Sequence, residues 1–143
     1  HAQPVGVFVN DQVGAFTIVH CADTEEQARA NGGHDAALWY MRYAFHVLAA
    51  RGREAQQIGP YEEFRRAHPI IAKVIDNSVT FEELDAEDMV IVGNPDKCVR
   101  KLEKYQAAGI DRVLCLMQAG HIPPDAVMKS IRLFGQYVIP RFA

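Results

Sequence analysis

Residues 89–118 run MVIVGNPDKCVRKLEKYQAAGIDRVLCLMQ, and this stretch decides the fold of the chain. A short run of apolar residues is typical of a strand in a parallel sheet that is buried on both faces. Asn94 is a good N-cap and Pro95 suits the first helical position, so a helix is predicted to follow the strand. Gly109 ends that helix, and a second apolar run begins three residues later. The stretch therefore predicts strand, helix and strand in succession.

The flanking sequence extends this pattern in both directions. Residues 15–21 predict an earlier strand, residues 25–50 a helix interrupted at Gly32–Gly33, and Pro124 opens a last helix. The order strand, long helical region, strand, helix, strand, helix favours right-handed crossovers and an α/β fold with parallel strands. We expect one domain over residues 1–143. Residues 52–88 are long for a connection, and we interpret them as a helical insertion or a lid.

Composition narrows the classes of function. The formal charge is −3, with 49% hydrophobic and 23% charged residues, so neither nucleic acid nor a membrane surface is an expected partner. Three widely spaced cysteines predict no disulfide framework and no metal site. No signal peptide is evident, and we expect a cytoplasmic protein. Because the chain begins with His1 rather than Met, we expect a piece of a longer protein or a tag remnant.

The last fifty or so residues resemble the C-terminal segment of the bacterial luciferase-like, flavin-dependent monooxygenases. The residues that carry the resemblance occur in the order of that family: Val92–Pro95 (VGNP), Ala108–Asp111 (AGID), Arg112–Gln118 (RVLCLMQ), Gly120–Pro123 (GHIP) and Ser130–Phe142. Residues 16–30, FTIVHCADTEEQARA, match an earlier step of the same pattern. Each motif alone only marks a turn or the end of a helix or strand, and the resemblance depends on the order in which the motifs occur.

The resemblance implies the C-terminal part of a (β/α)8 TIM barrel, with parallel strands, outer helices and an incomplete barrel. A complete barrel takes about 250 residues, so the chain would supply the last three or so of eight strands. The family binds FMN, or the deazaflavin F420 in some branches, and uses reduced flavin and O2 to oxidise small organic substrates. We therefore expect a fragment of a flavin-dependent monooxygenase that is inactive in isolation, with its main flavin contacts outside these residues.

Sites in such a barrel lie at the carboxyl ends of strands. Gly93 and Asn94 precede a helix N-terminus that could hold a phosphate, although Asn94 is more often only an N-cap. Gly120 and His121 follow the last strand and could contact a flavin, although a loop histidine is more often exposed to solvent. His20 ends the first strand, and we interpret it as a core histidine. No catalytic residue is assigned.

Two other functions remain open. The first is a non-catalytic α/β module that self-associates or binds a partner through strand edges exposed where the barrel is cut, and we expect a homodimer or higher oligomer. The second is a small stand-alone α/β protein that binds a phosphorylated ligand at Asn94. Trp39, Tyr40 and Tyr43 form an aromatic patch, which we interpret as interface or core rather than as a flavin-stacking box.

Overall fold

A computed structural model describes residues 6–7, 11–54, 63 and 66–142, with side chains described outside residues 48–54. Its strands and main helices are β1 (Gly14–Cys21), α1 (Glu25–Ala30), α2 (Gly33–Glu54), α4 (Pro69–Ile75), α5 (Phe81–Ala86), β2 (Ile91–Gly93), α6 (Pro95–Ala107), β3 (Arg112–Leu116) and α7 (Pro124–Leu133). A π-helical turn (Phe134–Val138) and a 3-10 turn (Ile139–Arg141) follow α7. This order of elements is the one that the sequence predicts, including the break between α1 and α2.

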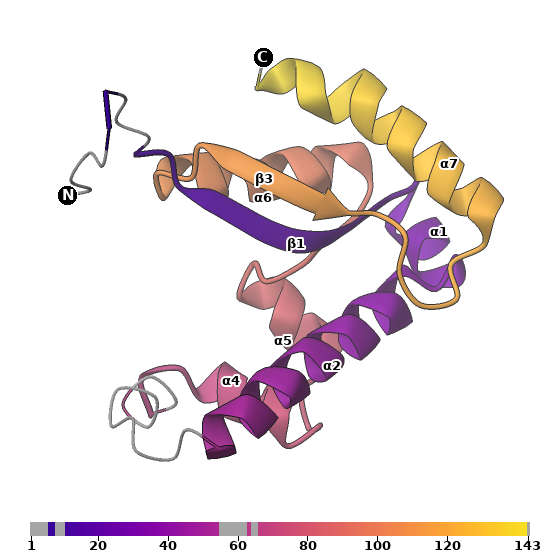
Figure 1. The fold of residues 1–143 in the computed structure, drawn as a ribbon. Coiled ribbons are helices and arrows are strands. Elements are labelled where there is room, and N and C mark those ends of the chain that lie inside the picture. The colour runs from indigo at the N-terminus through magenta and orange to yellow at the C-terminus, as the bar shows by residue number, and fades with distance from the viewer. Residues whose placement is uncertain (1–5, 8–10, 55–62, 64–65, 143) are drawn as a thin grey trace.

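The three strands form one parallel sheet in the order β2-β1-β3. Figure 1 shows β3 lying beside β1. The register pairs His20 with Val92 on one side of β1 and Phe16 with Leu114 on the other. Residues 17–21 of β1 are at most 3% exposed, as a central strand with a neighbour on each edge requires. The predicted α/β fold with parallel strands is thus confirmed in this coarse form.

The strand order differs from the expectation of consecutive barrel strands. In a (β/α)8 barrel each strand lies beside the next one along the chain, so β2 would lie between β1 and β3. Here β1 is central, and the sheet of the described residues is open. The physical reason is that β1 is apolar on both faces and has two edges to fill, and β3 pairs with the edge that β2 leaves free.

Helices cover both faces of this sheet. One cluster of buried side chains joins Ile18 and Val92 to α1, α2, α4 and α5, and includes Val74 and Leu84 at 0% exposure. A second cluster, which starts from Val19 on the opposite face, joins the sheet to α6 and to the π-helical turn. The sheet is therefore the middle layer over most of β1 and β2.

The described part of the 52–88 segment contributes to the core. Helices α4 and α5 pack beside α2, and Phe81 and Val79 are buried in the cluster that they share with it. Thr80 caps α5 with a capping box, in which its hydroxyl accepts from the Glu83 amide and the Glu83 carboxylate accepts from the Thr80 amide. The role of the segment as a lid stays a prediction. No helix in the described ranges is long and apolar enough to cross a membrane.

Candidate functional site

The carboxyl ends of the parallel strands meet at one edge of the sheet, which is where the sequence places the candidate site. There, Gly93 ends β2 and Asn94 begins α6. The Asn94 side-chain oxygen accepts a hydrogen bond from the Lys97 amide at 2.9 Å, and the Asn94 carbonyl accepts from the Cys98 amide. The first of these bonds occupies the Lys97 amide, one of the donors that an anion would need, so the observed contacts of Asn94 are those of an N-cap.

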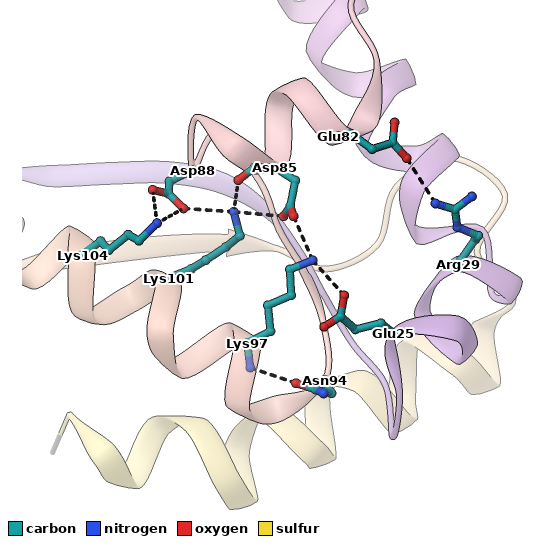
Figure 2. A network of polar contacts seen from close by, with 9 residues as sticks. All are labelled: Glu25, Arg29, Glu82, Asp85, Asp88, Asn94, Lys97, Lys101 and Lys104. Carbon is teal, nitrogen blue, oxygen red and sulfur yellow. Dashed lines mark hydrogen bonds and ion pairs between the residues drawn. The ribbon is translucent and has the colours of Figure 1, made fainter.

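The charges around this helix start are already paired (Figure 2). Lys97 Nζ lies 2.9 Å from Asp85 and 3.2 Å from Glu25. Burial pushes the pKa of Lys97 downward, but hydrogen bonds to these two carboxylates raise it overall. A Cβ on Gly93 would lie 2.7 Å from Lys97 Cδ, so the glycine gives room for the lysine stem. Lys97 is therefore committed to holding α6 against α1 and α5.

The other predicted pair, Gly120 and His121, follows β3. Gly120 has φ +58°, and a Cβ there would lie 3.1 Å from the Ala36 Cβ, so its loop rests closely on the first turn of α2. His121 is exposed. Because β1 separates β2 from β3, the structure places the two predicted pairs at the same edge of the sheet but on different strands.

The role of these four residues in holding a flavin stays a prediction, and their observed contacts do not support it. None of them lines the four hollows lined in part by Leu102, Asp35, Asp96 and Glu25, respectively. Asn94 is used as a cap, Gly120 is used for a close approach, and the first turn of α6 carries Asp96, whose carboxylate disfavours a second anion. The contacts that the described residues make at the predicted positions are thus those of a helix cap and of a closely packed loop.

His20 is a further residue at the carboxyl end of the sheet, and its hydrogen-bonding arrangement could not be predicted from the sequence. It is 0% exposed at the end of β1, and its Nε2 lies 3.2 Å from Asn31 Nδ2. The side-chain oxygen of Asn31, Oδ1, accepts from Gln27 Nε2 at 2.8 Å. The side-chain nitrogen of Asn31, Nδ2, is therefore the atom that donates to His20. His20 Nε2 is then the acceptor and Nδ1 carries the hydrogen, yet Nδ1 has no partner among the described residues. A relay of two side chains therefore fixes the tautomer of a buried imidazole.

We expect His20 to stay neutral well below the pH at which an exposed histidine titrates, because burial lowers its pKa. Burial also lowers the pKa of His34. Near and below pH ~6.5 the unfolded chain takes up protons at these positions and the folded chain resists. The free energy of unfolding should therefore fall from pH ~6.5 toward pH ~5, by up to ~1.4 kcal/mol per pH unit for the buried His20 and by less for His34, which solvent screens. Nitrogen-15 NMR should show the Nδ1–H tautomer for His20 at neutral pH. A His20 signal that titrates at or above pH ~6.5 would contradict this assignment.

A second feature is an uncovered apolar surface on the sheet. Phe16 and Leu114 are register partners on β1 and β3, and they are 53% and 60% exposed. The Phe16 ring approaches Tyr40 of α2, with 5.8 Å between ring centroids. Among the described residues no strand pairs with the outer edge of β3. Strand edges and apolar faces of this kind are typical of surfaces that another chain segment covers.

A hollow of about 320 Å³ lies on the opposite face, between α6, β3 and the end of the chain. Its walls are mostly apolar, and they include Leu102 and Tyr105 of α6. Two of its polar side chains are engaged: Asp111 accepts from the Val13 amide at 2.8 Å, and the Tyr105 hydroxyl donates to the Asp88 carbonyl at 2.5 Å. The hollow therefore offers apolar contact and little hydrogen bonding.

Comparison with known proteins gives the fold alone. No protein-family model matches the chain, and no curated protein matches it. Among solved structures, the chain is similar to the monooxygenase RslO1 from Streptomyces bottropensis, with 18% sequence identity and a TM-score of 0.55 over 95% of this chain and 33% of that one. The chain thus spans about a third of the length of that structure. At this identity the similarity concerns the fold, which is an α/β fold similar to part of a monooxygenase.

Proposed function

We propose that this chain is the C-terminal sector of a luciferase-like, flavin-dependent monooxygenase. The whole enzyme would bind FMN, with F420 as the alternative, and use reduced flavin and O2 to oxidise a small organic substrate. The ordered motifs of residues 92–142 support the family, and the similarity to a third of a monooxygenase supports the fold. In this proposal the sector supplies part of a barrel wall and its helical layer.

The uncovered sheet surface is the observation that carries the proposal. Leu114 and Phe16 present apolar side chains where a closed barrel would pack its interior. In a barrel, one edge of β1 takes the strand that precedes it along the chain. We infer that β3, which lies on that edge here, fills the place of a preceding strand. In the complete barrel, the preceding strand would pair with this edge of β1, and β3 would pair with β2 instead.

The cofactor contacts would come from outside this sector. Since Asn94 is engaged as a cap and His121 is exposed, neither is assigned a flavin contact in the proposal. The same apolar surface favours the second candidate function, a non-catalytic module that self-associates through the free edge of β3. The two functions differ in whether any longer form of the protein binds flavin.

Flavin titration separates these functions. The 143-residue chain is expected to leave the fluorescence of FMN and F420 unquenched at micromolar concentrations, because the Asn94 cap already takes the Lys97 amide at the start of α6. A chain extended at its N-terminus by the sequence that the natural gene encodes is expected to quench one of the two flavins saturably. An extended chain that binds neither flavin, or turnover of reduced flavin by the 143 residues alone, would refute the proposal.

A further inference from the structure

An exposed stripe of side chains runs along α2, on the side away from the core. Asp35, Trp39, Tyr43 and Val47 are spaced by four residues, so they lie in one row on the helix. Trp39 and Tyr43 are 54% and 58% exposed, and their rings are stacked with centroids 5.6 Å apart and planes at 4°. Solvated helix faces are normally charged, so a stacked aromatic pair there indicates a contact surface.

The stripe borders a shallow hollow of about 610 Å³ whose charges are unevenly distributed. Its walls come from α2, with Asn77 the one lining residue outside that helix in the described ranges. Asp35 lies at the N-terminal end, and Arg42 and His46 lie toward the C-terminal end. One guanidinium nitrogen of Arg42 donates to the Val79 carbonyl at 2.8 Å, while its Nε finds no acceptor among the described residues. The Arg42 Nε is buried, so the donor that this end presents at the surface is the ring of the exposed His46, while the other end carries the Asp35 carboxylate.

We propose that this stripe binds a second copy of the chain, with the two α2 helices antiparallel across a two-fold axis. The midpoint of the stripe falls between Trp39 and Tyr43, so Trp39 of one copy meets Tyr43 of the partner subunit. The same symmetry brings Asp35 of each copy beside His46 of the partner subunit, so the interface contains this pair two times. A parallel arrangement would instead place the two Asp35 carboxylates together, which costs free energy.

The α2 stripe is complementary to itself, which favours a second copy of the chain as its binding partner. A two-fold interface requires one patch to match itself, and the row has an acid at one end, a donor at the other and stackable rings between. Two half-exposed aromatic residues per copy form a small contact, well below the ~1,600 Å² of a standard interface, so the dimer should be weak and reversible. This proposal is independent of the flavin assignment and of the free edge of β3.

Sedimentation velocity over a concentration series tests the pairing. The wild-type chain should shift from monomer to dimer through the micromolar range, and the emission of Trp39, the single tryptophan, should move to shorter wavelength. Asp35→Lys should weaken the dimer by roughly fivefold, because it removes the carboxylate that accepts from His46 of the partner subunit. His46→Glu should have a similar effect, because it places two carboxylates opposite one another. The double variant should restore the affinity to within roughly twofold of wild type, because it re-forms both pairs with the signs reversed.

Leu114→Ser is the matched control, since it alters the apolar sheet surface and leaves α2 untouched. It should leave the α2 dimer unchanged. Circular dichroism checks that each variant is folded, and all three positions are exposed. A wild-type chain that stays monomeric at high micromolar concentration, a dimer indifferent to Asp35→Lys, a double variant without recovery, or a dimer abolished by Leu114→Ser would each overturn the proposal.

Discussion

Replacing Lys101 by methionine is expected to lower the free energy of unfolding by about 2–4 kcal/mol. Lys101 lies on α6 and is 5% exposed. Its Nζ lies 2.9 Å from Asp85 and 3.1 Å from Asp88, and it also donates to the Asp85 carbonyl (Figure 2). Asp85 Oδ1 lacks hydrogen-bond geometry toward any donor, so this contact is an ion pair rather than an aligned hydrogen bond. Methionine keeps the apolar stem and removes the charge that two half-buried carboxylates share.

The loss stays below that of a fully isolated buried charge, because Asp85 keeps Lys97 and Asp88 keeps Lys104. Lys104→Met is the matched control: it also removes a partner of Asp88, but Lys104 is 62% exposed, so the cost should be under ~1 kcal/mol. Urea unfolding of both variants measures the difference. Equal losses would show that burial of Lys101 contributes nothing.

The same pair of variants predicts a dependence on pH. Burial pushes the pKa of Asp85 upward, yet the ammonium groups of Lys97 and Lys101 beside it hold it below its usual value. Asp88 behaves likewise through Lys104 and Lys101. A lowered carboxyl pKa stabilises the fold above the unfolded pKa of about 3.9, and this contribution disappears as pH falls through the folded value. The gap between wild type and Lys101→Met should therefore shrink below pH ~4.

Local chemistry explains which parts of the fold could be predicted. The N-cap at Asn94, the capping box at Thr80 and the break before Gly33 each depend on residues within one helical turn, so the sequence contains the whole signal. Strand order depends on which edges pair, and a short apolar run looks the same in either neighbour. In the structure, residues 17–21 of β1 are buried on both faces, which marks β1 as the central strand.

The candidate site was harder to predict, because cap residues and ligand-binding residues share one composition. A glycine and an asparagine before a helix suit a phosphate or a cap equally, and the Lys97 contacts that decide between them come from α1 and α5. Lys97, Lys101 and Lys104 suggest a solvated helix face by their spacing. Only the approach of Asp85 and Asp88 buries Lys101 among them.

Gly33→Ala is expected to lower the free energy of unfolding by about 1–3 kcal/mol, although alanine is the better helix former. A Cβ at Gly33 would lie 2.8 Å from the Ala28 carbonyl oxygen and 3.0 Å from both His20 Cδ2 and Val92 Cγ1. Ala28 contributes backbone, and the other two are fully buried side chains of β1 and β2, so none can yield cheaply. Gly33 is not at positive φ, so the penalty is one of packing rather than of backbone strain.

Gly135→Ala gives the contrasting case, since a Cβ at that exposed position meets nothing within 4 Å. That variant should be neutral or gain up to ~1 kcal/mol through its lower backbone entropy when unfolded. Thermal and urea unfolding compare the two variants, and the His20 imidazole resonances should shift in Gly33→Ala alone, because the added methyl group presses on that ring. If Gly33→Ala were as stable as wild type, the turn between α1 and α2 would not be packed against His20. The His20 tautomer assigned through Asn31 would then lose its structural basis.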